Sequence, residues 1–208
     1  MSPAFKQIPN FLTFLRLGLI PIFVVLLNNP TTTRIYLAIA IFILAAVTDY
    51  VDGFIARRFG AVSDFGKLLD PLADKILVAS ALIMLLGLRN ESDGSPWIPA
   101  PLVVLLIARE FWVTGIRAMA ASRGVIVAAN SGGKVKSGLQ MVAIVFLLMH
   151  GHLFPFLGFR FPSEMIGKLL LGVSVIFSYW AAAEYTFDVF GEQKSASLQE
   201  NETDTMDS

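Results

Sequence analysis

Four aspartates at helical spacing are the residues of this chain whose types and positions point most directly to chemistry. Asp49 and Asp52 occur in one apolar segment, and Asp70 and Asp74 occur in the next. Because an α-helix turns about 100° per residue, positions three or four apart lie on the same face. We therefore expect each pair to line one face of its helix and the two faces to meet, which would gather four carboxylates in one place.

A group of carboxylates in an apolar environment needs compensating charge. One ionised aspartate at the centre of a membrane helix costs roughly 2.5–3.5 kcal/mol on insertion scales. Divalent cations supply this charge, and hard carboxylate oxygens suit Mg²⁺ or Mn²⁺. Two such ions about 3.5–4 Å apart would clamp a diphosphate and stabilise the attacking and leaving oxygens of a phosphoryl transfer. The chain contains no cysteine, which excludes thiolate ligands and disulfides.

Small residues accompany the aspartates on the same faces. Gly53 and Ala56 follow the first pair, and Gly66 precedes the second. Their lack of a large side chain would let a flat nucleotide base or a diphosphate approach the backbone. Taken singly, each is also an ordinary device for packing membrane helices, and that alternative stays open.

Basic residues in the following segments suit an anionic acceptor. Arg109 and Arg117 are two turns apart on the same broad side of one predicted helix, and Lys134 and Lys136 open the next. Arginine contacts phosphate in a bidentate manner and lysine as a point charge, so these residues predict a phosphate pocket. The alternative for the lysines is a role in membrane topology alone, and for Arg109 an ion pair.

The composition is that of an integral membrane protein: 208 residues, 55% of them hydrophobic, with zero net charge. At roughly 20 apolar residues per crossing, this length accommodates about six transmembrane helices and no separate soluble domain. We expect an all-α fold, a polytopic six-helix bundle. Hydropathy and the positions of Pro, Gly and Asn predict the crossings at 10–28, 34–58, 66–88, 98–121, 133–153 and 163–187.

Three regions follow from this pattern. Residues 1–9 are expected to form a juxtamembrane arm, residues 10–190 the catalytic domain, and residues 191–208 a disordered polar tail. Within the domain, the second helix should end near Phe59 at Gly60, and the third should begin after Ser63 or Asp64. This break would fold the two acidic faces against each other.

Most of the basic residues fall on the side of the membrane where this break lies. They are Lys6, Arg57, Arg58, Lys67, Arg117, Arg123, Lys134, Lys136 and Lys194. By the positive-inside rule this side faces the cytoplasm. The acidic site is therefore expected to open to the cytoplasm.

The acidic and small residues belong to one longer motif, Asp49-x2-Asp52-Gly53-x2-Ala56-Arg57-x8-Gly66-x3-Asp70-x3-Asp74. It matches in full the signature of the CDP-alcohol phosphatidyltransferases, and the chain resembles this family of integral membrane enzymes of phospholipid synthesis. The resemblance implies six transmembrane helices, a homodimer, two divalent cations (Mg²⁺ or Mn²⁺) and a CDP-linked lipid as donor.

The resemblance also implies roles for individual positions. The implied metal ligands are Asp49, Asp52, Asp70 and Asp74. Asp74 is also the implied general base. The positions that match the CDP-lipid-binding positions of the family are Gly53, Ala56, Arg57, Ser63 and Gly66. Gly66 lies where the family admits the cytidine.

Three segments outside the signature resemble the branch of the family that uses glycerol 3-phosphate. They are residues 8–16, 108–111 and 133–137, and the resemblance covers most of 8–185, with Ser137 where threonine is expected. It implies transfer of a phosphatidyl group from CDP-diacylglycerol to glycerol 3-phosphate, in a bacterial cytoplasmic membrane. Another acceptor, such as inositol phosphate or serine, is the alternative within the family. An ion-coupled transporter is a remote alternative, because a second copy of the acidic cluster is not seen in the sequence.

Overall fold

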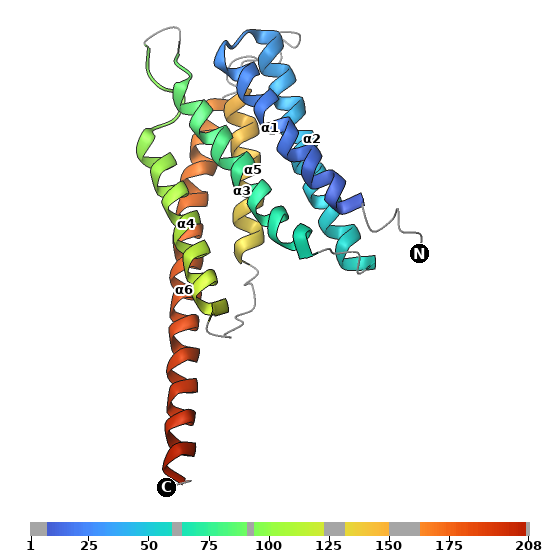
Figure 1. Cartoon of the computed structure of the whole chain (residues 1–208). Coiled ribbons are helices and arrows are strands. Elements are labelled where there is room, and N and C mark those ends of the chain that lie inside the picture. The colour runs from blue at the N-terminus through green and yellow to red at the C-terminus, as the bar shows by residue number, and fades with distance from the viewer. Residues whose placement is uncertain (1–7, 60–63, 91–93, 123–131, 150–162, 207–208) are drawn as a thin grey trace.

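The computed structural model consists of six α-helices (Figure 1). It describes residues 8–59, 64–90, 94–122, 132–149 and 163–206, with side chains described in 11–49, 72–90, 94–122, 137–149 and 163–191. The helices are α1 (Ile8–Asn28), α2 (Thr32–Phe59), α3 (Asp64–Gly87), α4 (Ala100–Ser122), α5 (Gly132–Leu148) and α6 (Ser163–Met206). Each of the six predicted crossings corresponds to one of these helices, which confirms the all-α fold class.

The break between α2 and α3 lies where the sequence predicts it. α2 ends at Phe59 and α3 begins at Asp64. A glycine next to a helix end and a serine or aspartate at a helix start are the residues that terminate and begin helices most readily. The two helices that carry the acidic motif are therefore separate elements joined by a short connection.

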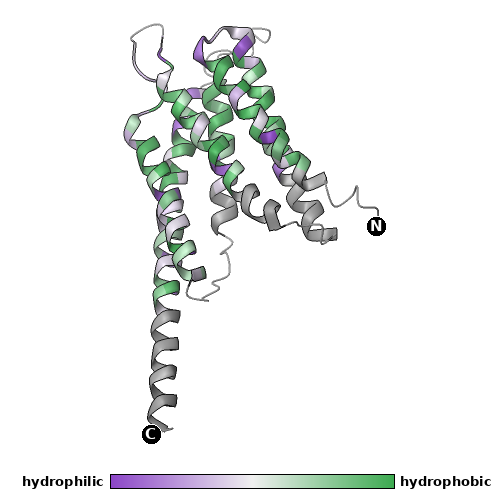
Figure 2. Cartoon of the chain, in the orientation of Figure 1, coloured by the Kyte–Doolittle hydropathy of each residue, from purple (hydrophilic) through white to green (hydrophobic). Residues whose placement is uncertain are grey.

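Much of the apolar surface of the bundle faces outward. Within the described residues, three helices are long and apolar enough to cross a membrane: Phe11–Asn28 in α1, Thr32–Asp49 in α2 and Ser163–Gly191 in α6. Only 28%, 28% and 33% of these windows is buried inside the protein. Figure 2 shows hydrophobic residues along much of the length of the helices that are coloured there. Such a surface suits lipid as the surrounding solvent, so the protein is an integral membrane protein.

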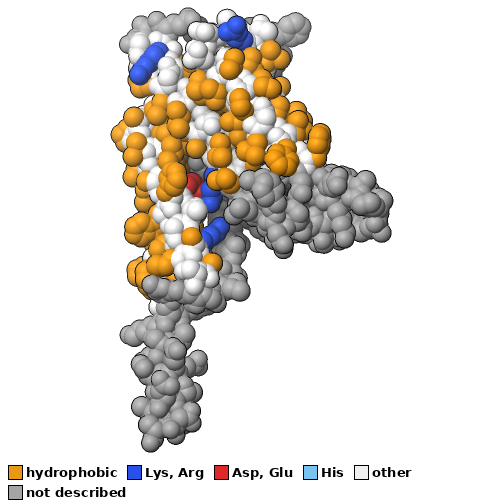
Figure 3. All heavy atoms as spheres, viewed as in Figure 1, with side chains coloured by type: hydrophobic (Ala, Val, Ile, Leu, Met, Phe, Trp, Pro, Cys, Tyr) orange, Lys and Arg blue, Asp and Glu red, His pale blue; other side chains and the backbone are white. Residues whose placement is uncertain are grey.

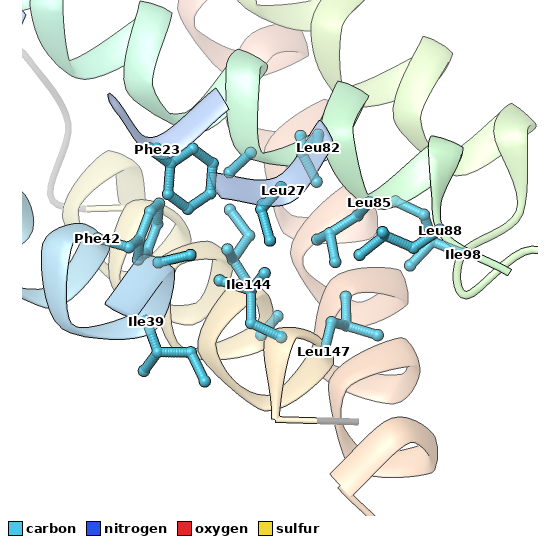
Figure 4. Packing of buried hydrophobic residues seen from close by; sticks show 14 of the residues in the cluster. Phe23, Leu27, Ile39, Phe42, Leu82, Leu85, Leu88, Ile98, Ile144 and Leu147 are labelled. Carbon is cyan, nitrogen blue, oxygen red and sulfur yellow. The ribbon is translucent and has the colours of Figure 1, made fainter. Parts of the chain in front are cut away.

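The main core lies between α1, α2, α3 and α5, with the residues that flank the loop between α3 and α4, and α4 and α6 contribute Val103, Leu106 and Leu171 to it. The labelled side chains of Figure 4 converge there from α1, α2, α3, α5 and the flanks of the loop. The rings of Phe23 in α1 and Phe42 in α2 have centroids 5.9 Å apart. Ile144 and Leu147 of α5 are fully buried in the same cluster. This packing holds α3, which carries Asp74, against α1 and α5.

α6 packs along both α4 and α5. With α4 it shares a second apolar cluster of Val113, Ala120, Ala182, Tyr185 and Val189. Polar contacts join the same two helices, since Tyr179 Oη donates to the carbonyl oxygen of Leu105 at 3.1 Å and Trp112 Nε1 donates to Thr186 Oγ1 at 3.2 Å. α4 is thereby fixed through α6 as well as through α3.

The domain boundaries stay a prediction, and two helices of the structure extend past them. α1 begins at Ile8, inside the predicted arm, and the remainder of that arm lies outside the described residues. α6 continues to Met206, inside the predicted tail, and extends away from the other helices (Figure 1). After Gly191 the sequence contains neither glycine nor proline, and it includes good helix formers such as Glu, Gln, Lys, Ala and Leu, which permit the helix to continue.

Candidate active site

Asp49, the first aspartate of the motif, lies in α2 opposite an arginine of α1. Arg16 Nη1 is 2.6 Å from Asp49 Oδ1. The arginine side chain is fully buried, whereas the aspartate side chain is 32% exposed. The arginine therefore pairs with Oδ1 of Asp49 from the interior of the bundle, and part of the aspartate side chain stays accessible to solvent.

Asp74, the last aspartate of the motif, lies in α3 at the edge of a cavity of about 180 Å³. Residues of α3, α4 and α5 line this cavity, and they are Leu72, Asp74, Lys75, Ile76, Val78, Ala79, Leu82, Leu106, Ile107, Glu110, Phe111, Thr114, Ser137, Gln140 and Met141. An apolar cavity of about 150 Å³ holds a molecule of the size of benzene. This cavity has room for part of an organic ligand next to a carboxylate.

The cavity has different chemistry at its two ends. Along α3, the charged residues Asp74 and Lys75 give way to Val78, Ala79 and Leu82. At 1.5 Å per residue, the eight residues from Asp74 to Leu82 span about 12 Å. On α4, likewise, Thr114 and Glu110 give way to Leu106. A ligand with a polar head and an apolar tail fits this gradient.

Lys75 connects α3 to α4 at the polar end. Its Nζ donates to Thr114 Oγ1 at 2.7 Å, and Thr114 Oγ1 donates to the carbonyl oxygen of Glu110 at 2.7 Å. Lys75 also interacts electrostatically with Asp74 and with two arginines, Arg109 and Arg117. The three basic side chains repel one another, so their gathering favours a negatively charged ligand between them.

Arg109 and Arg117 differ in their surroundings although both belong to α4. Arg109 is buried, its Nε donates to the carbonyl oxygen of Ser178 at 2.9 Å, and its Nη1 is 3.0 Å from Glu110 Oε1. These contacts match the alternative role of Arg109, in which it forms an ion pair instead of binding phosphate. Arg117 is exposed, with its guanidinium carbon 5.4 Å from the ring centroid of Tyr185 in α6. Arg117 therefore has the surface that can meet a soluble anion.

Acidic and basic side chains meet on a face of the protein that is otherwise mostly hydrophobic (Figure 3). Charge in such a setting is costly, and in membrane proteins it usually marks a functional site. Among the side chains that the structure describes, Asp49 and Asp74 are the two members of the acidic motif, and no group of three metal-binding side chains is found there.

The other predicted site residues are placed by their helices only. Asp52, Gly53, Ala56 and Arg57 belong to α2, Gly66 and Asp70 to α3, and Lys134 and Lys136 to α5. Their side chains, and Ser63 as a whole, lie outside the described residues. The meeting of all four carboxylates stays a prediction.

Sequence reasoning did not identify Arg16 and Lys75 as parts of the site. A signal was present for Arg16, because it is the only charged residue in the whole of α1. Lys75 directly follows Asp74 and carries no comparable signal, because its importance comes from contacts with α4. Both residues were found through pairings between helices.

Comparisons with known proteins show the family to which the sequence belongs. A family model described as CDP-alcohol phosphatidyltransferase matches residues 6–180. A protein of Bacillus subtilis (strain 168) named CDP-diacylglycerol–glycerol-3-phosphate 3-phosphatidyltransferase is 40% identical, over 86% of this chain and 93% of the relative. Proteins of the same name from Escherichia coli (strain K12) and Shigella flexneri serotype 5b (strain 8401) are 37% identical, over 86% of this chain and 92% of each relative.

Proposed function

This chain belongs to the CDP-alcohol phosphatidyltransferase family, and we propose that it transfers the phosphatidyl group from CDP-diacylglycerol to glycerol 3-phosphate, with CMP as the second product. The observation that carries this proposal is the complete acidic motif, within a match that extends over residues 6–180. The names of the relatives supply the acceptor. Asp74 at a cavity with a polar and an apolar end suits a reaction between a lipid and a soluble compound.

We propose that two divalent cations, Mg²⁺ or Mn²⁺, are held by Asp49, Asp52, Asp70 and Asp74. The donor set fits, because carboxylate oxygens are the ligands that these ions prefer and Asp49 presents an accessible carboxylate. When bound, the cations would neutralise charge on the diphosphate of the donor and on the departing CMP.

We propose that Asp74 is the general base. It would take the proton of the glycerol 3-phosphate hydroxyl, whose oxygen then bonds to the phosphorus that carries the diacylglycerol. The bond between this phosphorus and the oxygen of CMP breaks, and CMP leaves with the electron pair. Arg57 would stabilise the negative charge of CMP, and general-base assistance of this kind contributes typically 10²–10⁴-fold to a rate.

The apolar part of the cavity supports a lipid donor. We propose that the start of an acyl chain lies along Val78, Ala79 and Leu82 while the reacting phosphorus lies near Asp74. Gly53, Ala56, Ser63 and Gly66 would receive the cytidine diphosphate part of the donor. They belong to α2, α3 and the connection between them.

The basic residues support an acceptor that carries phosphate. We propose that Arg117, Lys134 and Lys136 contact this phosphate, with Arg109 and Lys75 adding positive charge near it. Glycerol 3-phosphate is a dianion near neutral pH, so a cluster of cations favours it over a neutral alcohol. Serine and inositol phosphate remain the alternatives for the test below.

The position in the cell follows from the charge distribution. We propose that the site faces the cytoplasm, because basic residues are more numerous on the side of the membrane where the break lies. The bacterial relatives support a bacterial cytoplasmic membrane. We also propose that the protein acts as a homodimer.

The direct test is an acceptor competition with purified, detergent-solubilised protein. CDP-diacylglycerol and Mg²⁺ are supplied with glycerol 3-phosphate, inositol phosphate or serine, and CMP release is measured. We expect release with glycerol 3-phosphate that stops when a chelator is added. Release with another acceptor alone would contradict the acceptor, and the absence of release with all of them would contradict the enzymatic function.

A further inference from the structure

Arg16 occupies a position that packing alone does not explain. It is the only charged residue of α1, a helix of 21 residues, and its side chain is fully buried. Taking an arginine out of water costs several kcal/mol, and replacing a buried ion pair by apolar side chains often leaves stability unchanged or improves it. An apolar residue would therefore serve the core of this bundle at least as well.

The contact of Arg16 with the acidic motif offers a reason. Its Nη1 lies 2.6 Å from Asp49 Oδ1, at the distance of a close ion pair. Because the arginine is buried inside the bundle, it restrains the aspartate side chain from the buried side. The Asp49 side chain is 32% exposed, so it remains accessible to a ligand.

We infer that Arg16 is a positioning residue that holds Asp49 in the orientation in which its carboxylate binds a divalent cation. The inference rests on the proposed function, in which Asp49 is a metal ligand. Groups that orient metal ligands are typically worth 10–100-fold in metal affinity or activity. Arg16 acts through Asp49 and contacts neither substrate.

The test uses full-length protein in detergent with three variants. Arg16→Met removes the charge and keeps a long side chain, whereas Arg16→Lys keeps the charge and loses the planar guanidinium. Arg34→Met is the matched control, because Arg34 is an exposed arginine at the start of α2 whose Nη1 donates to the carbonyl oxygen of Asn29. Mn²⁺ binding is measured by electron paramagnetic resonance without substrates, and kcat and KM are measured separately.

We expect Arg16→Met to weaken Mn²⁺ binding by about 10–100-fold and to lower kcat while the KM for glycerol 3-phosphate changes little. Arg16→Lys should restore part of both quantities, and Arg34→Met should match the unmodified protein. If Arg16→Met lowers only the melting temperature, with normal Mn²⁺ affinity and normal kcat, the role is structural and the inference is overturned.

A second comparison covers the case in which Arg16→Met does not fold. Asp49→Asn combined with Arg16→Met leaves no unpaired charge at the pair, and it is compared with Asp49→Asn alone. If Arg16 acts through Asp49, the double variant binds Mn²⁺ as the single variant does. A further loss of affinity would overturn the inference. Failure of the unmodified protein to bind Mn²⁺ or release CMP would instead count against the proposed function.

Discussion

A close contact between helices α5 and α6 leads to a prediction about stability. Gly167 of α6 is buried, and a Cβ added there would lie 2.7 Å from Leu147 Cγ and 3.0 Å from the backbone nitrogen of Leu147. Leu147 is itself fully buried in the main core, so it has little room to move. Small residues at such points let membrane helices approach closely. Gly167→Ala should therefore destabilise the bundle.

The magnitude follows from two opposing effects. Adding a methyl group to a well-packed core costs typically 1–3 kcal/mol. Replacing glycine by alanine within a helix gains roughly 0.5–1 kcal/mol. Gly172, also in α6, has no heavy atom within 4 Å of an added Cβ, so Gly172→Ala should show only the gain. The gain cancels between the two variants, and Gly167→Ala should be less stable than Gly172→Ala by about 1–3 kcal/mol.

The assay is unfolding of detergent-solubilised protein by sodium dodecyl sulfate, followed by circular dichroism. A third variant, Leu147→Ala, tests whether Leu147 is the residue that the added methyl group meets, because it removes most of that side chain. The cost of Gly167→Ala should then be smaller in the Leu147→Ala background than alone. Equal stability of Gly167→Ala and Gly172→Ala, or equal costs in both backgrounds, would refute the packing argument.

Four further outcomes are expected. Asp74→Asn should lower CMP release by at least about 10²-fold while part of the donor binding persists, and near-normal release would contradict its role as base. Lys134→Ala should raise the KM for glycerol 3-phosphate, measured by steady-state kinetics, by about 10-fold or more, because one charge-assisted hydrogen bond to the phosphate is lost. An unchanged KM would contradict the assignment of Lys134 to the phosphate pocket. Ala79→Phe should fill the apolar part of the cavity and raise the KM for long-chain CDP-diacylglycerol. Ile83→Phe, at an exposed position of α3, should leave this KM unchanged. Equal effects of the two variants would contradict an acyl site. Phe42→Ala should destabilise the protein by about 3–5 kcal/mol in the unfolding assay, and a loss below about 1 kcal/mol would show that the ring is not part of a close-packed core.

The sequence and the structure agree best where local patterns decide the outcome. The end of α2 at Phe59 and the start of α3 at Asp64 illustrate this, because helix ends depend on residues within one turn and both lie within the predicted range. The tail after Gly191 has no such local signal. Its polar composition predicts disorder, which stays a prediction, and the same residues are compatible with the helix that continues α6 to Met206.

The candidate site shows the same division. The spacing of the acidic motif was sufficient to place Asp49 and Asp74 on two consecutive helices and to indicate metal-dependent phosphoryl transfer. It could not show that Arg109 is held by Ser178, because these residues are 69 positions apart and meet only when α4 packs on α6. Burial of Arg109 and exposure of Arg117 likewise depend on the neighbouring helix.

By itself, the sequence determined the six helices, their membrane environment and the family, because hydropathy, helix-ending residues and the spacing of a motif are properties of short stretches of chain. The tertiary structure alone decided which side chains meet across helices: Arg16 with Asp49, Lys75 with Thr114, and the walls of the cavity beside Asp74. The physical reason is that packing sets the rotation and separation of each helix relative to its neighbours. No local pattern along the chain contains that information.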